Sequence, residues 1–269
     1  MPMRFRRQRD PEFVFVVTFG RSGSTLVQGL LNTMPRTLVR GENGFFLGGF
    51  FAGTKAATAF ATRHAKHKPG KASSAFYGVR ALTPERFAKH VRALSIDVLL
   101  GAQSRRRFDR IGFKEVLWHE IPAADTHAFF DWFDLVFPNA KYVLNTRKVD
   151  DALGSGFWQR RDPGHAVAAT ARVQEIQAFL RDTRPERCFR TDYEVITGPD
   201  RAASDAQLRG LAEFVTGACG DDLLAELRAT LSVGHGPAPF GKSRTREAEW
   251  SVTAPTVDPV DPATGPASE

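Results

Sequence analysis

The sequence predicts an α/β protein with a central parallel sheet flanked by helices. Short apolar runs rich in β-branched and aromatic residues alternate with longer stretches of helical periodicity, which is typical of βαβ units. In addition, the first apolar run, Phe13–Val17, leads through a glycine-containing turn directly into a helical stretch that begins at Ser24. A strand, a tight turn and a helix in this order are the elements of a phosphate-binding loop.

Five runs carry the strand signal, because each is short and contains Val, Ile, Phe or Thr between turn or helical residues. In chain order they are Phe13–Val17, Thr37–Val39, Arg110–Glu115, Lys141–Thr146 and Cys188–Tyr193. Helical patterns occupy the intervals, at Ser24–Met34, Pro84–Leu99, Asp125–Phe137, Asp150–Gln159, Gly164–Arg181, Asp205–Val215 and Asp221–Leu231. Because ligands bind at the carboxyl ends of strands in doubly wound sheets, the residues that follow each strand are the first candidates for a site.

The pattern predicts a single domain over residues 11–250 and a disordered tail over residues 251–269. The tail is rich in Pro, Ala, Thr and Asp, and such a segment cannot bury enough apolar surface to offset its ordering entropy. Residues 44–71 combine the run FFLGGFFAG with a loose pattern of Ala, Thr, His and Lys. We expect a partly helical excursion there, which either covers a substrate or is an ordinary surface insertion.

Composition limits the partners and the compartment. Lys and Arg total 37 against 30 Asp and Glu, and the net charge of +7 favours anionic partners. The two cysteines, Cys188 and Cys219, form neither a disulfide framework nor a metal cluster, which fits a reducing cytoplasm. The basic N-terminus lacks the apolar run of a signal peptide, and no stretch is long enough to span a bilayer. We therefore expect a cytoplasmic protein without stable membrane insertion and without a metal ion.

The turn after the first predicted strand has the composition of an anion-binding loop. Its candidate binding residues are Gly20, Arg21, Ser22, Gly23, Ser24 and Thr25. The glycines permit a tight turn with backbone N–H groups close to an anion, and the helix start adds unpaired N–H groups and the positive end of its dipole. The alternative is that the turn merely caps a helix, with Ser22 as the cap.

The ATPase version of such a loop requires a lysine before the Ser or Thr, and here that position is Ser24. The loop thus lacks the charge that reaches a transferring γ-phosphate. The segment resembles the 5′-phosphosulfate-binding loop of the sulfotransferase family, in which a strand, Arg-Ser-Gly-Ser/Thr-Thr and an apolar helix follow one another. The resemblance implies a P-loop-NTPase-like sulfotransferase fold, with 3′-phosphoadenosine 5′-phosphosulfate (PAPS) as the sulfuryl donor and an acceptor hydroxyl.

The resemblance extends to the segment YVLNTRKVDDALGSGFW, again a predicted strand followed by a helix. In the family an arginine just after this strand and a serine about two turns onward hold the 3′-phosphate of the donor. The matching residues are Arg147 and Ser155. The arginine fork supplies paired, charge-assisted hydrogen bonds to an oxyanion. Without the first loop, the same residues would be read as a surface arginine and a neutral helix serine.

Sulfuryl transfer requires a base for the acceptor proton and a positive charge at the bridging oxygen. Several branches of the family place a glutamate in an Arg-small-Gly-Glu setting, which implies Glu42 as the base, with Arg40 nearby to position either Glu42 or the acceptor. Other branches use a histidine, and His119 is the reserve candidate. Lys114, at the end of the third predicted strand, is expected to contact the transferring group or to steer the acceptor. The alternatives are a solvated glutamate, an ordinary histidine and a lysine snorkelling from a strand end.

Two further segments resemble the family more weakly. Tyr193 and Glu194 stand where the family has Tyr-Glu-Asp-Leu, an element that packs a strand onto a helix, and we expect no catalytic role for them. Near the C-terminus, Lys242, Ser243 and Arg244 match by position and composition a basic loop that closes the donor pocket.

Two other functions fit parts of the sequence. A divergent P-loop kinase of a small molecule would need the missing lysine and a clear Mg²⁺-binding Asp after an apolar strand. A non-enzymatic polyanion binder would use the basic runs at residues 4–9 and 104–110, but no nucleic-acid-binding motif accompanies them, and no nucleic-acid partner is expected. The acceptor remains open among a glycan, a lipid, a phenol and a small metabolite, and the oligomeric state is equally open.

Overall fold

The structure is a computed structural model that describes residues 10–68, 70–154 and 162–233. Within these ranges, parallel strands form a five-stranded sheet in the order β2-β3-β1-β4-β5. The strands are β1 (Glu12–Val17), β2 (Thr37–Arg40), β3 (Arg110–Glu115), β4 (Lys141–Thr146) and β5 (Cys188–Asp192). The predicted parallel sheet is confirmed, with each strand on a run that the apolar pattern marked. The tail predicted at residues 251–269 lies outside the described ranges.

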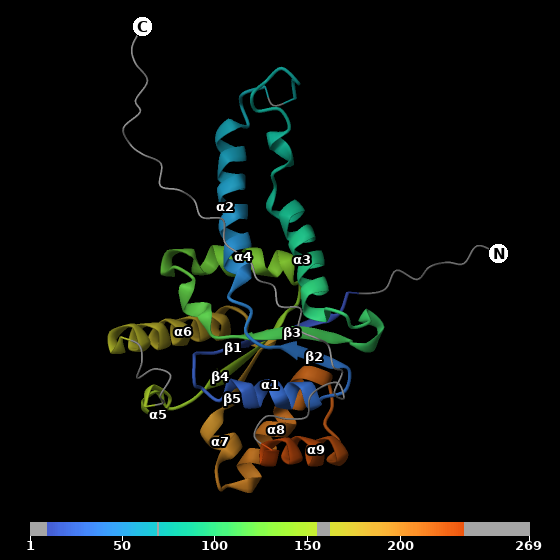
Figure 1. Cartoon of the computed structure of the whole chain (residues 1–269), viewed down its shortest axis with the longest axis vertical. Coiled ribbons are helices and arrows are strands. Elements are labelled where there is room, and N and C mark those ends of the chain that lie inside the picture. The colour runs from blue at the N-terminus through green and yellow to red at the C-terminus, as the bar shows by residue number, and fades with distance from the viewer. Residues whose placement is uncertain (1–9, 69, 155–161, 234–269) are drawn as a thin grey trace, which may run out of the picture. The chain divides into compact units, whose positions relative to one another are not determined.

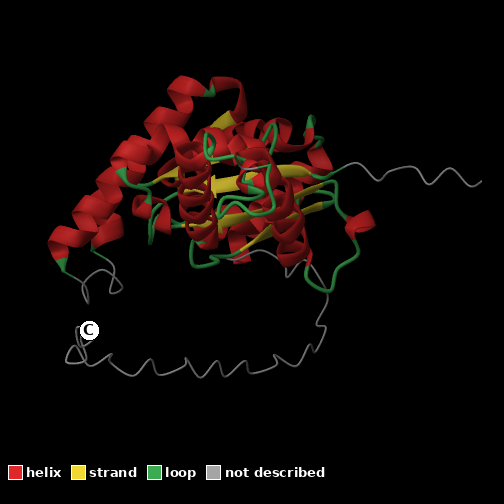
Figure 2. Cartoon of the chain, turned by 90° about the horizontal axis from the view of Figure 1, so that it is seen from above, coloured by secondary structure: helices red, strands yellow, loops and turns green. Residues whose placement is uncertain are grey.

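Helices follow the strands and cover both faces of the sheet. The α-helices are α1 (Ser24–Thr33), α2 (Phe46–His64), α3 (Pro84–Leu100), α4 (Thr126–Val136), α5 (Val149–Leu153), α6 (Pro163–Thr183), α7 (Tyr193–Thr197), α8 (Arg201–Thr216) and α9 (Asp221–Val233). Figure 1 shows α1, α8 and α9 on one side of the sheet and α3, α4 and α6 on the other. Seen from above, helices cross over the strands (Figure 2). The α/β class is confirmed.

The central strand β1 shows why the sheet is buried on both faces. Successive side chains of a strand point to opposite faces. Phe13 and Phe15 face α4, where the rings of Phe15 and Phe133 lie 4.9 Å apart between centroids. Val14 and Val16 belong to a buried cluster with apolar residues of α1, α8 and α9. Because both faces are covered, the run is continuously apolar rather than alternating, as is usual for a parallel strand.

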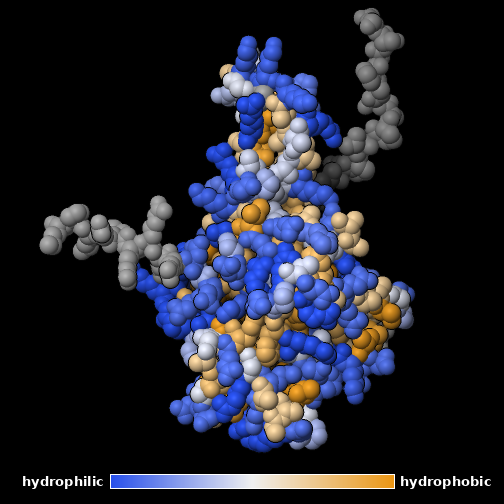
Figure 3. Space-filling view, turned by 180° about the vertical axis from the view of Figure 1, so that it is seen from behind, coloured by the Kyte–Doolittle hydropathy of each residue, from blue (hydrophilic) through white to orange (hydrophobic). Residues whose placement is uncertain are grey.

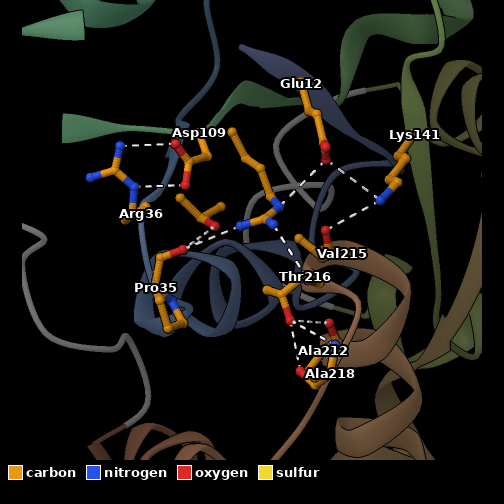
Figure 4. A network of polar contacts seen from close by, with 11 residues as sticks. Glu12, Pro35, Arg36, Asp109, Lys141, Ala212, Val215, Thr216 and Ala218 are labelled. Atoms are coloured by element: carbon orange, nitrogen blue, oxygen red, sulfur yellow. Dashed lines mark hydrogen bonds and ion pairs between the residues drawn. The ribbon is translucent and has the colours of Figure 1, made fainter. Parts of the chain in front are cut away.

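Charged residues tie neighbouring strands together at the amino edge of the sheet (Figure 4). Glu12 of β1 pairs with Arg110 of β3 (Nε–Oε2 3.5 Å) and with Lys141 of β4 (Nζ–Oε2 3.7 Å). Just before β2, Arg36 donates two hydrogen bonds to the carboxylate of Asp109, of 2.6 and 2.8 Å. These contacts join the strands at the edge opposite to the one where such sheets bind ligands.

Between β2 and β3, helices α2 and α3 run antiparallel and extend away from the sheet (Figure 1). The segment predicted as partly helical, residues 44–71, contains the whole of α2.

Residues 43–84 include no Asp or Glu, and the Lys and Arg residues among them are Lys55, Arg63, Lys66, Lys68, Lys71 and Arg80. Figure 3 shows that the far end of this helix pair is hydrophilic. In the described ranges, none of the helices has the length and apolarity that crossing a membrane requires.

Candidate active site

A cavity of about 440 Å³ lies at the carboxyl edge of the sheet. One lining residue lies at or just beyond the end of each strand. These residues are Arg21 after β1, Glu42 after β2, Lys114 in β3, Arg147 after β4 and Tyr193 after β5. The turn between β1 and α1 adds Gly20, Gly23, Ser24 and Thr25. The tertiary structure therefore gathers in one cavity most of the residues that the sequence marked separately.

The turn from β1 into α1 has the geometry of an anion cradle. Gly23 is the N-cap residue and has φ 78° and ψ 13°, in the left-handed region that favours glycine. Leu26 donates the first hydrogen bond of the helix, to the Gly23 carbonyl oxygen at 2.9 Å, so the amides of Ser24 and Thr25 precede the helical ladder. The first turn of α1 contains no acidic residue. The positive end of the helix dipole is therefore not offset by an acidic side chain of the helix's own first turn.

A buried polar network beneath this turn holds its shape. The hydroxyl oxygens of Ser22 and Thr18 are 2.6 Å apart, and Asn145 of β4 donates to the Ser22 carbonyl oxygen at 3.0 Å. Thr191 of β5 and Gln177 of α6 in turn donate to Asn145, at 3.1 and 3.0 Å. Ser22 is fully buried. The sequence marked Ser22 as a candidate binding residue, and in the structure its hydroxyl contacts that of Thr18 inside this network.

Arg147 and Tyr193 form the side of the cavity next to the turn. The guanidinium of Arg147 lies over the Tyr193 ring, 4.4 Å from its centroid, and its Nη1 donates to the Arg21 carbonyl oxygen at 2.9 Å. The same ring packs so closely on Gly23 that a Cβ there would lie 2.1 Å from Tyr193 Cδ2. Within the described ranges, the buried Nε of Arg147 has no hydrogen-bond partner. Because Arg147 lines the cavity, its stacked guanidinium places a positive charge beside the cradle.

Glu42 and Lys114 form an ion pair in the same cavity, between Lys114 Nζ and Glu42 Oε1. Glu42 follows β2, and Lys114 lies near the end of the adjacent strand β3. The lysine side chain is only 6% exposed, whereas the glutamate side chain is 52% exposed. The carboxylate is therefore open to a second molecule while the ammonium approaches it from the protein side.

Glu115, the next residue of β3, organises the loop that carries Glu42. Its fully buried carboxylate accepts hydrogen bonds from the backbone N–H groups of Asn43 and Phe45 through Oε2, both at 3.1 Å. Its Oε1 accepts from the N–H groups of Val116 and Leu117, at 2.8 and 3.2 Å. Because side chains alternate along a strand, Lys114 and Glu115 point to opposite faces of the sheet. One carboxylate thus fixes both the loop after β2 and the turn after β3.

Other candidates from the sequence lie elsewhere. Among the described residues, His119 does not line this cavity: its Nδ1 lies 3.2 Å from the Val116 carbonyl oxygen, and its ring lies 5.7 Å from that of His165. Ser155 and the three C-terminal residues Lys242, Ser243 and Arg244 are outside the described ranges. In the described part of the chain, no group of three His, Cys, Asp or Glu side chains is placed to hold a metal ion.

Sequence reasoning passed over three residues that shape the site, namely Glu115, Asn145 and Gln177. A signal for the first two was present, because Asn145 is a polar residue inside an apolar strand run and Glu115 is a charged residue at the end of a strand, directly before the apolar Val116 and Leu117. Buried polar groups are costly unless they are hydrogen-bonded, and such a position therefore indicates a specific partner. Tyr193 was noted, but only as a packing residue, and its position in the cavity comes from the end of β5 meeting the turn before α1.

Comparison with known proteins places this architecture in a family. The family model described as "Sulfotransferase family" matches residues 11–215. Among solved structures, the sulfotransferase domain of the olefin synthase from Synechococcus PCC 7002 is similar, with 18% identity and a TM-score of 0.49, over 90% of this chain and 82% of that chain. No curated protein matches at a significant level. The family match covers most of the chain and includes all five strand ends that line the cavity, so the protein belongs to the sulfotransferase family.

Proposed function

We propose that the protein transfers a sulfuryl group from PAPS to the hydroxyl of an acceptor. The observation that carries the proposal is the single cavity that joins the Arg21–Thr25 cradle to the Glu42–Lys114 pair. The cradle offers donors for an anion, and the pair offers a carboxylate and an ammonium next to it. These are the two functions that sulfuryl transfer to an alcohol requires.

The donor has two anionic ends, a 5′-phosphosulfate and a 3′-phosphate, and the cavity offers a positive group for each. We assign the phosphosulfate to the backbone amides and hydroxyls of Ser24 and Thr25, together with Gly20, Arg21 and Gly23. We assign the 3′-phosphate to Arg147, whose positively charged side chain lines the cavity next to the cradle. Ser155 is proposed as its partner from the family pattern alone, and Ser22 is assigned to the shape of the turn.

Glu42 is the proposed base, and Lys114 the proposed electrostatic group. When bound, the donor supplies a sulfuryl group joined to its phosphate through a bridging oxygen. The acceptor oxygen bonds to sulfur as the bond from sulfur to the bridging oxygen breaks, and the acceptor proton passes to Glu42. Lys114 offsets the charge that develops on the departing oxygen. His119, which does not line this cavity and whose Nδ1 lies 3.2 Å from the Val116 carbonyl oxygen, has no role in this scheme.

The remaining parts of the proposal are the domain, the compartment and the metal. We propose one catalytic domain over residues 11–250. We also propose that the protein acts in the cytoplasm, and the free thiols of Cys188 and Cys219 in the described chain support this compartment. We propose a reaction without a metal ion, since Lys114 and the cradle already supply positive charge at the cavity.

Isothermal titration with 3′-phosphoadenosine 5′-phosphate, the desulfated donor, tests the proposal. We expect micromolar binding to the wild type that Arg147→Ala abolishes or strongly weakens. Arg181→Ala is the matched control, because Arg181 is 67% exposed and pairs only with its neighbour Asp182 among the contacts described. ATP with Mg²⁺ should bind poorly. No binding of the desulfated donor by the folded wild type, or a preference for ATP with Mg²⁺, would contradict the proposal and favour the kinase or the polyanion binder.

A further inference from the structure

A second and larger cavity, of about 790 Å³, lies beside α2. Its floor is a set of packed rings, in which Phe129 lies 5.7 Å from Phe45 and 5.2 Å from Phe51 between centroids. One wall is the side of α2 that carries small residues, namely Gly49, Ala52, Ala56 and Ala59. Their spacing places them on one face of the helix, where short side chains leave the space open. The volume falls within the usual range for small-molecule sites, about 300–1,000 Å³.

Two chain segments line both cavities. The loop after β2 contributes Glu42 to the cradle cavity and then Gly44 and Phe45 to the second one. The segment after β3 contributes Val116 to the cradle cavity and Ile121 to the second one. The buried carboxylate of Glu115 binds both segments at once, through four backbone N–H groups. The second cavity thus begins within two residues of the proposed base, on the other side of the same loop.

The chemistry of the second cavity selects against a sugar. Among its lining residues, the charged side chains are Lys55, Glu120 and Asp125. Two of these are already paired, since Lys55 Nζ lies 2.5 Å from Asp125 Oδ1. That pair joins α2 to the short helix Ala123–Asp125, so it ties one wall of the cavity to the other. A glycan needs a hydrogen-bond partner for most of its hydroxyls, and besides Glu120 the remaining lining residues have apolar side chains or none, which offer no such partner.

We propose that this cavity binds the apolar body of the acceptor, and that the acceptor is an uncharged alcohol carrying an alkyl chain or a ring system. The inference rests on the proposed function, because it places the acceptor hydroxyl at Glu42. The small residues of α2 and the ring floor provide the apolar contact, and the loop Glu42–Phe45 lines both cavities. Burial of the apolar body then contributes the affinity for the acceptor, while the residues of the cradle cavity carry out the reaction.

Two glycines of α2 provide a matched test. Both Gly49 and Gly53 are helical, and a Cβ at either would meet no atom within 4 Å. Gly49 lines the cavity and Gly53 does not. A leucine at either position should strengthen the helix to a similar extent, since glycine is a poor helix former. Only Gly49→Leu places a side chain in the cavity.

The first experiment is isothermal titration of the full chain with 1-decanol and with 2-naphthol, without any donor present. We expect both probes to bind the wild type and Gly53→Leu equally. Gly49→Leu should bind both probes at least about tenfold more weakly. Even a methylene-scale change in a hydrophobic pocket has an effect of that size. Ala56→Leu is a second blocking variant, and it should behave as Gly49→Leu does. Equal binding by all variants, or no binding of either probe, would overturn the inference.

A parallel titration with 3′-phosphoadenosine 5′-phosphate separates this inference from the proposed function. All three leucine variants should bind the desulfated donor as the wild type does, because none of them touches the cradle. Loss of probe binding with donor binding intact means that the apolar cavity is the part affected, as the inference requires. Donor binding by the wild type without any probe binding would contradict the inference alone, whereas probe binding without donor binding would contradict the proposed function alone. In turnover, sulfation of 1-decanol or 2-naphthol should exceed that of glucose, and the reverse order would also overturn the inference.

Discussion

The buried ammonium of Lys114 is paired with the half-exposed carboxylate of Glu42, across the ends of two adjacent parallel strands. An isolated charge in a buried position is costly. Loss of the partner therefore destabilises the protein more for a buried lysine than for a surface lysine. Here the partner is the group that we propose takes the acceptor proton. The same contact thus satisfies Lys114 and holds one oxygen of Glu42 in place, next to the cradle.

Glu42→Gln tests the base directly. The amide keeps the shape of the side chain but cannot take a proton, so kcat for sulfation should fall by about 10²–10⁴-fold, the usual contribution of a positioned base. Affinity for 3′-phosphoadenosine 5′-phosphate should change little, since Glu42 is not assigned to the donor. Glu85→Gln, at the exposed start of α3, is the control and should leave kcat unchanged. Full activity of Glu42→Gln would exclude Glu42 as the base and return His119 to consideration.

Glu115→Gln tests a positioning role. One of the two carboxylate oxygens becomes an NH₂ group, which cannot accept from the backbone N–H groups that it faces. We expect a loss of stability of about 1–3 kcal/mol, the cost of leaving buried donors unpaired, measured by urea unfolding. We also expect kcat to fall with KM for the donor unchanged, because the loop of Glu42 moves while the cradle stays. A fall in stability without any change in kcat would reduce Glu115 to a structural residue.

Gly23→Ala tests the close contact between the cradle and Tyr193. The new Cβ would lie 2.1 Å from the Tyr193 ring, so either the turn or the ring must move, and Arg147 is stacked on that ring. We expect at least about tenfold weaker binding of 3′-phosphoadenosine 5′-phosphate, equivalent to the loss of one good contact of roughly 1.4 kcal/mol.

Gly217→Ala is the matched control for that variant. Gly217 also has a positive φ, of 89°, but a Cβ there would meet nothing within 4 Å, and it lies at the end of α8. The alanine should therefore cost about 1–2 kcal/mol of stability from backbone strain and leave donor binding intact. Equal donor affinity of Gly23→Ala and the wild type would show that the turn tolerates the displacement.

The contact between Arg36 and Asp109 should make part of the stability depend on acid pH. The hydrogen bond from Arg36 lowers the pKa of Asp109 below its ordinary value. The carboxylate is therefore favoured in the folded state, so its contribution is present above the unfolded pKa of about 3.9 and is lost as pH falls through the folded value. The stability difference between wild type and Asp109→Asn, from urea unfolding, should be largest near neutral pH and shrink below about pH 4. A difference that grows toward acid would contradict this assignment.

Local patterns were sufficient for the strands and for the cradle. The run Phe13–Val17 is apolar at every position because it is covered on both faces, and the turn before Ser24 could be recognised from its glycines and from the helical pattern that follows it. The boundaries differ little: the fifth strand ends at Asp192, one residue before the predicted end, because the Asp192 carboxylate accepts from the N–H groups of Glu194 and Val195 and starts α7. Capping by a side chain overrides the strand tendency there.

The site depended more on tertiary structure than on pattern. Glu42, Lys114 and Arg147 could be marked from their places after strands and from the family resemblance, but nothing in the sequence pairs Glu42 with Lys114. That pairing requires β2 to lie beside β3, although α2 and α3 separate the two strands in the chain. His119 shows the converse, since it is close in sequence to Lys114, yet the turn after β3 directs its ring to the Val116 carbonyl oxygen.

The sequence by itself determined the α/β class, the strand positions and the residues of the anion cradle, because each depends on hydrophobic periodicity or on a turn between adjacent residues. Only the tertiary structure decided the strand order, the Glu42–Lys114 pair, the burial of Ser22, and the closeness of Tyr193 to Gly23. Each of these depends on which side chains share a face and which strands are neighbours. Such contacts join residues far apart in the chain, and their energies are realised only when the sheet has assembled.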